Sequence, residues 1–255
     1  MIVEELRAAG CVFAEEEAAL IVAEATGAHD VRRMVGERVA GRPLEQVLGW
    51  AEFDGLRVAV APGVFVPRRR SRLLVDLAAE RAAGLEHAVV VDLCCGTGAL
   101  AAAVLARVPT AEVYAADLDP DAVACARRNL SGDRVFEGDL FAALPDTLRG
   151  RIDVLVVNAP YVPTDAIATM PPEARDHEHR VALDGGADGL AVQRRVIASA
   201  PGWLAPGGDL VIETGRDQVP GTTAAMAEAG LLAEQHTLPE LDAVAVRGRA
   251  DDRAR

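Results

Sequence analysis

The chain has 255 residues with 26 basic and 39 acidic side chains, which gives a formal net charge of −13. Every basic residue is arginine, and the absence of lysine excludes Schiff-base chemistry, a P-loop lysine and a kinase-type lysine. The acidic balance argues against a general nucleic-acid binder, and the length predicts one large domain or two modest ones.

The cysteines and the apolar segments argue against a secreted or membrane-bound protein. The four cysteines show no Cys-x-x-Cys spacing, so neither a zinc site nor a disulfide framework is predicted; they are Cys11, Cys94, Cys95 and Cys125. The start of the chain lacks the basic-then-apolar layout of a signal peptide, and no segment approaches ~18 consecutive apolar residues. We therefore expect a cytoplasmic protein with no membrane partner.

Residues 1–50 are predicted to form short helices, because their apolar residues recur at helical spacing between glycines. Asp54-Gly55 then separates two short strand-like runs within residues 51–60, which predicts a β-hairpin. An extended segment rich in proline and valine follows it. We therefore expect a helical domain over 1–50, a hairpin and linker over 51–70, and a larger domain over 71–250.

Strands and helices alternate in the predicted larger domain. Apolar runs predict strands at 89–91, 112–116, 152–157 and 209–213, with helices at 99–108 and 120–130 between them. A long loop is expected around Pro171-Pro172 and the charged stretch 173–180, two last strands within 231–248, and a frayed end over 249–255. This alternation is typical of a doubly wound parallel α/β sheet.

A glycine-rich turn, Cys94-Cys95-Gly96-Thr97-Gly98, follows the first strand of that sheet. Asp117, at the end of the next strand, stands 19 positions after Gly98 and suits the hydroxyl groups of a ribose. Gly96-x-Gly98-x-x-Ala101 also satisfies a dinucleotide fingerprint, so a nicotinamide-dependent oxidoreductase is an alternative.

Acidic side chains at the strand ends favour a cationic cofactor over a pyrophosphate. Asp92 stands four residues before Gly96, and Asp92, Asp117 and Asp139 are expected to line the carboxyl ends of three strands. S-adenosylmethionine carries a sulfonium and an ammonium group and no phosphate, so we predict this methyl donor. Asp139 would reach the adenine, while Cys94 and Cys95 are expected to pack within the turn. The predicted cofactor-binding residues are Asp92, Cys94, Gly96, Thr97, Gly98, Asp117, Leu118, Asp139, Leu140 and Asn158.

The tetrapeptide Asn158-Ala159-Pro160-Tyr161 follows a buried strand at the same edge of the sheet. An amide or amino nitrogen is a poor nucleophile because its lone pair is delocalised, so its orientation matters. The Asn158 side-chain oxygen and the Ala159 carbonyl would accept its two N–H bonds, while Tyr161 would pack on its plane. We predict Asn158 and Tyr161 as catalytic residues and Ala159, Pro160 and Arg68 as substrate-binding residues.

Taken together, these motifs resemble the HemK/PrmC-type protein-(glutamine-N5) methyltransferases. The resemblance covers about residues 40–215 and includes the glycine-rich turn, Asp117, the Asn158–Tyr161 segment and Ala182-Leu183-Asp184-Gly185-Gly186. It implies a class I methyltransferase fold with a Rossmann-like seven-stranded sheet, preceded by a helical substrate-recognition domain. It also implies that the acceptor is a glutamine side chain of a translation protein, a peptide release factor or a ribosomal protein.

The sequence departs from the family pattern at two places near the expected cleft. Asn-Ala-Pro-Tyr replaces the family's Asn-Pro-Pro-Tyr, and Arg69-Arg70-Ser71-Arg72 replaces its Pro-Glu-Thr-Glu after Pro67-Arg68. The arginine strip, residues 68–72, is either a solvated helix entry or a contact for phosphates or an acidic substrate face. An N-methyltransferase acting on the amino group of a nucleic-acid adenine is therefore an alternative, although the net charge argues against it.

No metal is predicted. His177 and His179 lie two positions apart on an expected loop, and the sequence offers no third ligand nearby.

Overall fold

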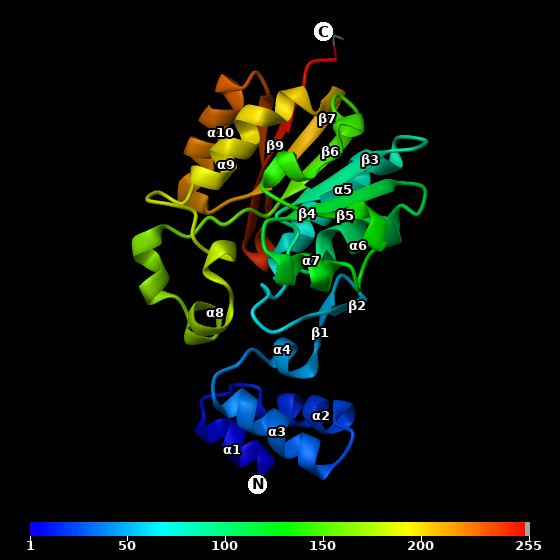
Figure 1. Ribbon diagram of the computed structural model, residues 1–255. Helices are drawn as coiled ribbons and strands as arrows, with labels where there is room; N and C mark the ends of the chain where they lie inside the picture. Colours follow the sequence, from blue (N-terminus) through cyan, green and yellow to red (C-terminus); the bar gives the residue numbers. More distant parts are fainter. Residues whose placement is uncertain (253–255) are drawn as a thin grey trace.

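The computed structural model describes residues 1–252; the remaining part of the predicted frayed end, 253–255, lies outside the described residues. Four helices form the N-terminal part, α1 (Ile2–Ala8), α2 (Ala14–Glu24), α3 (Ala28–Val39) and α4 (Leu44–Leu48). They pack around a small apolar core in which Leu6, Ile21 and Met34 are buried. Figure 1 shows these helices grouped at one end of the molecule, below the sheet. The division of the chain into separate domains stays a prediction.

The predicted hairpin is confirmed. Strands β1 (Trp50–Phe53) and β2 (Leu56–Ala59) pair antiparallel, with Phe53 opposite Leu56. Asp54 and Gly55 both have positive φ, 53° and 77°, which is the conformation that a two-residue type I′ turn requires. The hairpin joins the N-terminal helices to the sheet (Figure 1).

A seven-stranded sheet with the order β5-β4-β3-β6-β7-β9-β8 forms the centre of the molecule. Its strands are β3 (Val89–Leu93), β4 (Glu112–Asp117), β5 (Val135–Glu137), β6 (Ile152–Val157), β7 (Leu204–Glu213), β8 (Leu232–Leu238) and β9 (Ala243–Arg249). Adjacent strands from β5 to β7 are parallel, whereas β9 pairs antiparallel with both β7 and β8. The strands that alternate with helices are therefore parallel, as predicted, and the two last strands predicted within 231–248 are β8 and β9. Their short connection suits only an antiparallel pair.

Helices cover both faces of the sheet (Figure 1). One apolar core lies under α5 (Arg72–Ala83), α6 (Ala99–Arg107) and α7 (Pro120–Ala126), and the other under α9 (Ala191–Ser199) and α10 (Val219–Glu228). Successive strand residues enter opposite cores, Val90 and Val154 the first, Val91 and Leu155 the second. Because both faces are covered, these strands are almost wholly apolar.

The predicted long loop between β6 and α9 is partly helical. It contains α8 (Pro172–His177). Pro172 is the first residue of this helix, and proline is favourable there because the N–H groups of a first helical turn have no partner within the helix. The α8 segment extends away from the sheet, on the side of the molecule that faces the N-terminal helices (Figure 1). Among residues 1–252, no helix combines the length and apolar character that spanning a membrane would require.

A buried arginine connects the N-terminal helices to α8. Arg38 on α3 is 8% exposed; its Nε donates to Glu17 at 2.6 Å and its Nη1 donates to Glu173 on α8 at 2.6 Å. Gln46 of α4 adds a second connection, since its Nε2 donates to the carbonyls of Val64 and His177. These contacts hold the α8 segment beside the linker that precedes the sheet.

Replacing Arg38 with alanine is expected to lower the free energy of unfolding by about 3 kcal/mol, because it leaves the buried Glu17 carboxylate without its partner. Urea denaturation measures the effect. The control is Arg32→Ala, which removes an ion pair with Glu5 whose side chains are 58% and 45% exposed; a loss below about 1 kcal/mol is expected there. Equal losses in both variants would contradict the structural role of Arg38.

Candidate active site

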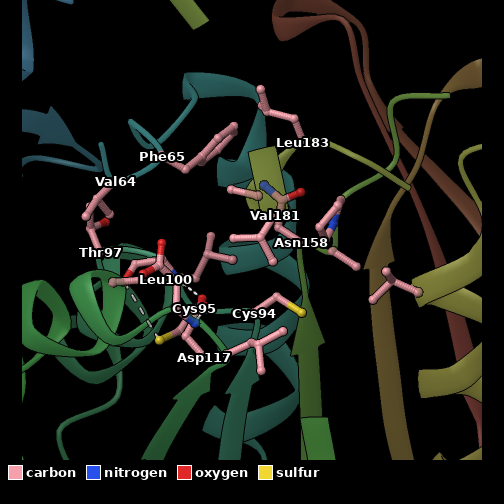
Figure 2. A pocket seen from close by; sticks show the side chains of 18 of the residues that line it. Val64, Phe65, Cys94, Cys95, Thr97, Leu100, Asp117, Asn158, Val181 and Leu183 are labelled. Carbon is pink, nitrogen blue, oxygen red and sulfur yellow. Dashed lines mark hydrogen bonds between the residues drawn. The ribbon is translucent and has the colours of Figure 1, made fainter. Parts of the chain in front are cut away.

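A cleft opens at the carboxyl ends of β3, β4 and β6. The strand order reverses between β3 and β6, since the chain continues outward to β4 and β5 on one side and to β7 on the other. Ligands of open α/β sheets bind at such a reversal. Figure 2 shows Cys94, Asp117 and Asn158 at the strand ends, with Val64 and Phe65 of the linker and Val181 and Leu183 of the loop after α8 around the same cavity.

Most of the predicted site residues line this one cleft. Those with a lining role are Arg68, Cys94, Gly96, Thr97, Asp117, Leu118, Asp139, Leu140, Asn158, Ala159, Pro160 and Tyr161. Asp92 and Gly98 do not line it. The structure therefore brings together residues that are 93 positions apart in the sequence, from Arg68 to Tyr161.

Asp117 holds the glycine-rich turn in place. Its Oδ2 accepts a hydrogen bond from the Gly96 N–H at 2.8 Å, and its Oδ1 accepts one from the Asp119 N–H at 2.9 Å. Gly96 and Gly98 have positive φ, 54° and 74°, so L side chains would be strained there. At Gly98 an added Cβ would also lie 2.9 Å from Leu130 Cδ1. Burial raises the pKa of the Asp117 carboxyl, and the backbone N–H donors oppose that rise.

Asp92 lies beneath the turn and not in the cleft, so the prediction that it lines the cleft is wrong. Its Oδ2 accepts from the Ala101 N–H of α6 at 3.2 Å, and the residue is 1% exposed. The alternation of side chains along β3 directs it toward α6. Its Oδ1 is buried without a hydrogen-bond partner among the described residues. Burial raises the pKa of this carboxyl to about 8.

Asp139 and two leucines form another wall of the cleft. Leu118 and Leu140 follow β4 and β5, and both line the cavity beside Asp139. Asp139 is half-exposed and accepts a 2.6 Å hydrogen bond from Arg195 of α9. The arrangement pairs an apolar surface with a carboxylate at its edge.

The Asn158 amide and the Tyr161 ring come from the segment that follows β6. Asn158 Nδ2 donates to Ser71 Oγ at 3.1 Å, and Tyr161 OH donates to Glu213 Oε1 at 3.2 Å. Burial raises the pKa of the Tyr161 hydroxyl to about 12. The phenol therefore stays protonated at neutral pH and acts as a hydrogen-bond donor. The side chain of Ala159 is fully buried at the floor of the cleft.

Ser71 and Glu213 belong to this site although sequence reasoning did not select them. Ser71 stands at the start of α5 and makes no side-chain cap hydrogen bond; its Oγ donates to Glu213 Oε2 at 2.6 Å. Glu213 is the last residue of β7, directly after the apolar run 210–212, and it lies 142 residues away from Ser71. The one feature of the sequence that could have identified Glu213 is its position directly after an apolar strand segment, because a side chain there lies at the edge of the sheet where ligands bind.

The arginine strip is largely neutralised by carboxylates. Arg68 Nη2 donates to both oxygens of Glu178, at 2.7 and 2.8 Å, and its guanidinium lies 4.6 Å from the Phe65 ring centre. Arg70 pairs with Glu213, while Arg72 lies 3.7 Å from Asp54 and 3.8 Å from Asp76. Within residues 1–252, Arg69 is the member of the strip without an ion pair. The strip is therefore not a free basic surface.

His179 joins the loop after α8 to the start of α7. Its Nδ1 lies 2.5 Å from Asp119 Oδ2, and the ligand atoms of Asp119, Asp121 and His179 all lie within 4.8 Å of one another. His177, the other histidine considered as a ligand, is not part of this group. The hydrogen bond between His179 and Asp119 is sufficient to explain why these three side chains lie close together, so we assign no metal ion to the group.

Comparison with known proteins places the chain among methyltransferases. The family described as "Methyltransferase small domain" matches residues 55–172. The "Release factor glutamine methyltransferase" of Geobacter sulfurreducens is 41% identical over 73% of this chain and 66% of its own length. The protein of the same name from Deinococcus radiodurans is 40% identical over 78% of this chain and 72% of its own length.

A relative with a different acceptor is almost as similar. The "4-amino-L-phenylalanine/4-methylamino-L-phenylalanine methyltransferase" of Streptomyces pristinaespiralis is 36% identical over 79% of this chain and 70% of its own length. The chain spans just under two thirds, 66% and 65%, of the first two curated relatives that it matches.

A solved structure shares the fold. The T. thermophilus 16S rRNA methyltransferase, solved in complex with AdoMet and guanosine, superposes with a TM-score of 0.56 at 21% identity. The match covers 79% of this chain and 49% of that one. Together with the seven-stranded sheet, it confirms the predicted class I methyltransferase fold.

The buried Asp92 carboxyl predicts a pH dependence of stability. Its pKa rises from 3.8 to about 8 on folding, so the folded chain binds more protons than the unfolded chain between these values. The stabilisation is complete below about pH 4 and is lost as the pH rises toward 8, at about 1.4 kcal/mol per pH unit. Urea denaturation of the wild type and Asp92→Asn across this range should show the difference between their unfolding free energies changing with that sign. Parallel curves would contradict the prediction.

Proposed function

Because the chain belongs to the family of release factor glutamine methyltransferases, we propose that it transfers a methyl group from S-adenosylmethionine to the side-chain amide nitrogen of a glutamine in a protein. The observation that carries the proposal is the placement of Asn158, beside the fixed glycine-rich turn and with its side-chain oxygen unpaired among the described residues. The family and the fold imply a methyl donor of this type.

The charge around the turn fits S-adenosylmethionine better than a dinucleotide. In a dinucleotide site, the N–H groups of the turn face the pyrophosphate. Here the Gly96 N–H already donates to Asp117, which places a carboxylate where a phosphate would be repelled. The residues that would hold the donor are the Cys94–Thr97 backbone, Asp117 at the ribose, and Leu118, Asp139 and Leu140 at the adenine. Bound there, the sulfonium would supply an activated methyl group.

The acceptor amide would be oriented and not deprotonated in advance. The Asn158 Oδ1 and the Ala159 carbonyl would each accept one N–H of the glutamine amide, which turns the face of its nitrogen toward the methyl group. Tyr161, held between Glu213 and Arg70, would pack against the amide plane. Positioning of this kind accounts for a large part of a rate enhancement, on the order of 7–11 kcal/mol at best.

The proposed acceptor is a protein, with a peptide release factor first among the candidates because the relatives carry that name. The Streptomyces pristinaespiralis relative acts, by its name, on an amino group of a modified phenylalanine. The alternative of a nucleic-acid acceptor is weakened because carboxylates neutralise three of the arginines, Arg68, Arg70 and Arg72. We also propose, from the sequence alone, a cytoplasmic enzyme with an N-terminal substrate-recognition domain.

The experiment that tests the proposal uses methyl-labelled S-adenosylmethionine with purified release factor, 4-amino-L-phenylalanine, and a protein extract with and without nuclease. Label on a glutamine, located by mass spectrometry, supports the proposal and identifies the protein. Label confined to the amino acid or removed by nuclease would overturn the protein-glutamine assignment. Calorimetric binding of NAD without binding of S-adenosylmethionine would overturn the methyltransferase assignment.

Asn158→Ala is expected to lower kcat by ~100-fold or more, because the acceptor amide loses the group that fixes its orientation. The dissociation constant for S-adenosylmethionine, measured by calorimetry, should change by less than about threefold, since most of the cofactor contacts remain. Unchanged turnover would contradict the assigned role.

Asp117→Ala is expected to weaken the binding of S-adenosylmethionine, which Asn158→Ala leaves almost unchanged. Loss of its carboxylate frees the Gly96 N–H and removes the proposed ribose contact, so the affinity for S-adenosylmethionine should fall by ~10-fold or more. Calorimetry measures this directly, with Asp121→Ala, a neighbouring exposed acid, as the control. Matching affinities for all three proteins would exclude Asp117 from the cofactor site.

A further inference from the structure

Glu213 and four side chains near it form a continuous set of hydrogen bonds, which we call the Glu213 cluster: Arg70, Ser71, Asn158, Tyr161 and Glu213. Ser71 is 2% exposed and Glu213 is 3% exposed, so water does not substitute for these contacts. Glu213 Oε2 accepts from Ser71 Oγ at 2.6 Å, while its Oε1 accepts from Arg70 Nε at 3.1 Å and Tyr161 OH at 3.2 Å.

The chemistry of these groups fixes the direction of every bond in the cluster. An ionised carboxylate only accepts and a guanidinium only donates, whereas a hydroxyl has a single proton to give. Ser71 gives its proton to Glu213, so its oxygen is left to accept from Asn158, and only the NH₂ end of that amide donates. The Asn158 oxygen is therefore the end that faces the cleft.

We infer that Ser71 and Glu213 are positioning residues that set which end of the Asn158 amide meets the acceptor. The inference rests on the proposed function, in which the acceptor presents N–H groups that need an oxygen opposite them. With the amide reversed, Asn158 would direct its NH₂ at the acceptor NH₂, and two donors would meet. Neither residue contacts the acceptor in this scheme; both act through Asn158.

Arg70 makes the buried carboxylate tolerable in this chain. A buried carboxylate is costly unless it is paired. The side chains that contact it are those of Arg70 and Ser71 before α5 and Tyr161 after β6, whereas Gln193 of α9 donates only to the Glu213 backbone carbonyl. Arg70 is the one cation among them. At this position the resembled family has a glutamate, so the ion pair is a feature of this chain.

Glu213→Gln tests the inference because it keeps the shape of the side chain and changes the direction of one bond. The glutamine oxygen is expected at the Oε1 position, where Arg70 and Tyr161 donate, which places its NH₂ against Ser71. Ser71 would then donate to Asn158 and reverse that amide. We expect kcat to fall by ~100-fold, with less than about a threefold change in the dissociation constant for S-adenosylmethionine.

A double-mutant cycle separates this relay from general stabilisation. Ser71→Ala breaks the connection to Asn158, so adding Glu213→Gln to it should cause no further loss of kcat, and Ser71→Thr should restore most of the activity. The control is Thr222→Val, which removes a buried hydroxyl bonded to Gln193 and lies outside the cluster; its activity should stay near that of the wild type. Additive losses, or equal losses in Thr222→Val, would overturn the inference.

An acceptor-independent measurement keeps the two proposals distinguishable. In ¹⁵N-edited NMR spectra, the Asn158 NH₂ protons should show contacts to the Ser71 β-protons in the wild type, and these contacts should be lost in Glu213→Gln. Retained contacts in Glu213→Gln would overturn the inference. If the contacts are lost in Glu213→Gln but the wild type methylates none of the tested acceptors, the proposed function is overturned and the inference about Ser71 and Glu213 is not.

Discussion

The site depends on one constraint, that parallel strands of a sheet end at the same edge. β3, β4 and β6 are neighbours in the sheet although β6 follows β4 by 35 residues, and their last residues deliver the glycine-rich turn, Asp117 and Asn158 to one cleft. β3 and β6 are buried along almost their whole length and β4 in part, so the polar residues of the site gather where the apolar runs stop. The position of the chemistry is thus a consequence of how the core is built.

Carboxylates order this cleft, and each of them works with backbone or arginine partners. Asp117 holds the turn through the Gly96 N–H, Glu178 holds the linker through Arg68 and the Val66 N–H, and Glu213 holds the Ser71 and Tyr161 hydroxyls. An acidic chain without lysine would carry strong repulsion at such a density of acids. Arginine relieves it with planar donors that reach both oxygens of a carboxylate.

Much of this arrangement follows from local sequence patterns. The Asp54-Gly55 turn and the apolar strands depend on short-range preferences, and the structure confirms them. The helix predicted from residue 120 begins at Pro120, where the Asp119 side chain caps α7. Asp92 was predicted in the cleft but lies under α6, because the sequence alone does not show toward which face of the sheet a side chain near the end of a strand points. Ser71 and Glu213 were missed for another reason: their significance lies in a contact across 142 residues, which no local pattern encodes. The short helix α8 likewise depends on tertiary contacts through Arg38 and Gln46.

The arginine strip illustrates how a departure from a family pattern is compensated inside the molecule. Read as sequence, Arg69-Arg70-Ser71-Arg72 in place of Pro-Glu-Thr-Glu suggests a new contact for phosphates. In the structure Arg70 turns inward to a buried glutamate and Ser71 retains a hydroxyl where the family has threonine. The hydroxyl accepts the hydrogen bond from the Asn158 NH₂ group, and either serine or threonine supplies it. The residue at position 70 determines only whether the negative charge of Glu213 is neutralised by an ion pair. The residues around Asn158 thus keep the groups that orient an acceptor. If this chain prefers another acceptor than its relatives, we expect the difference to lie at the exposed Arg69 and in the cleft walls, which include Phe65, Val181 and Leu183.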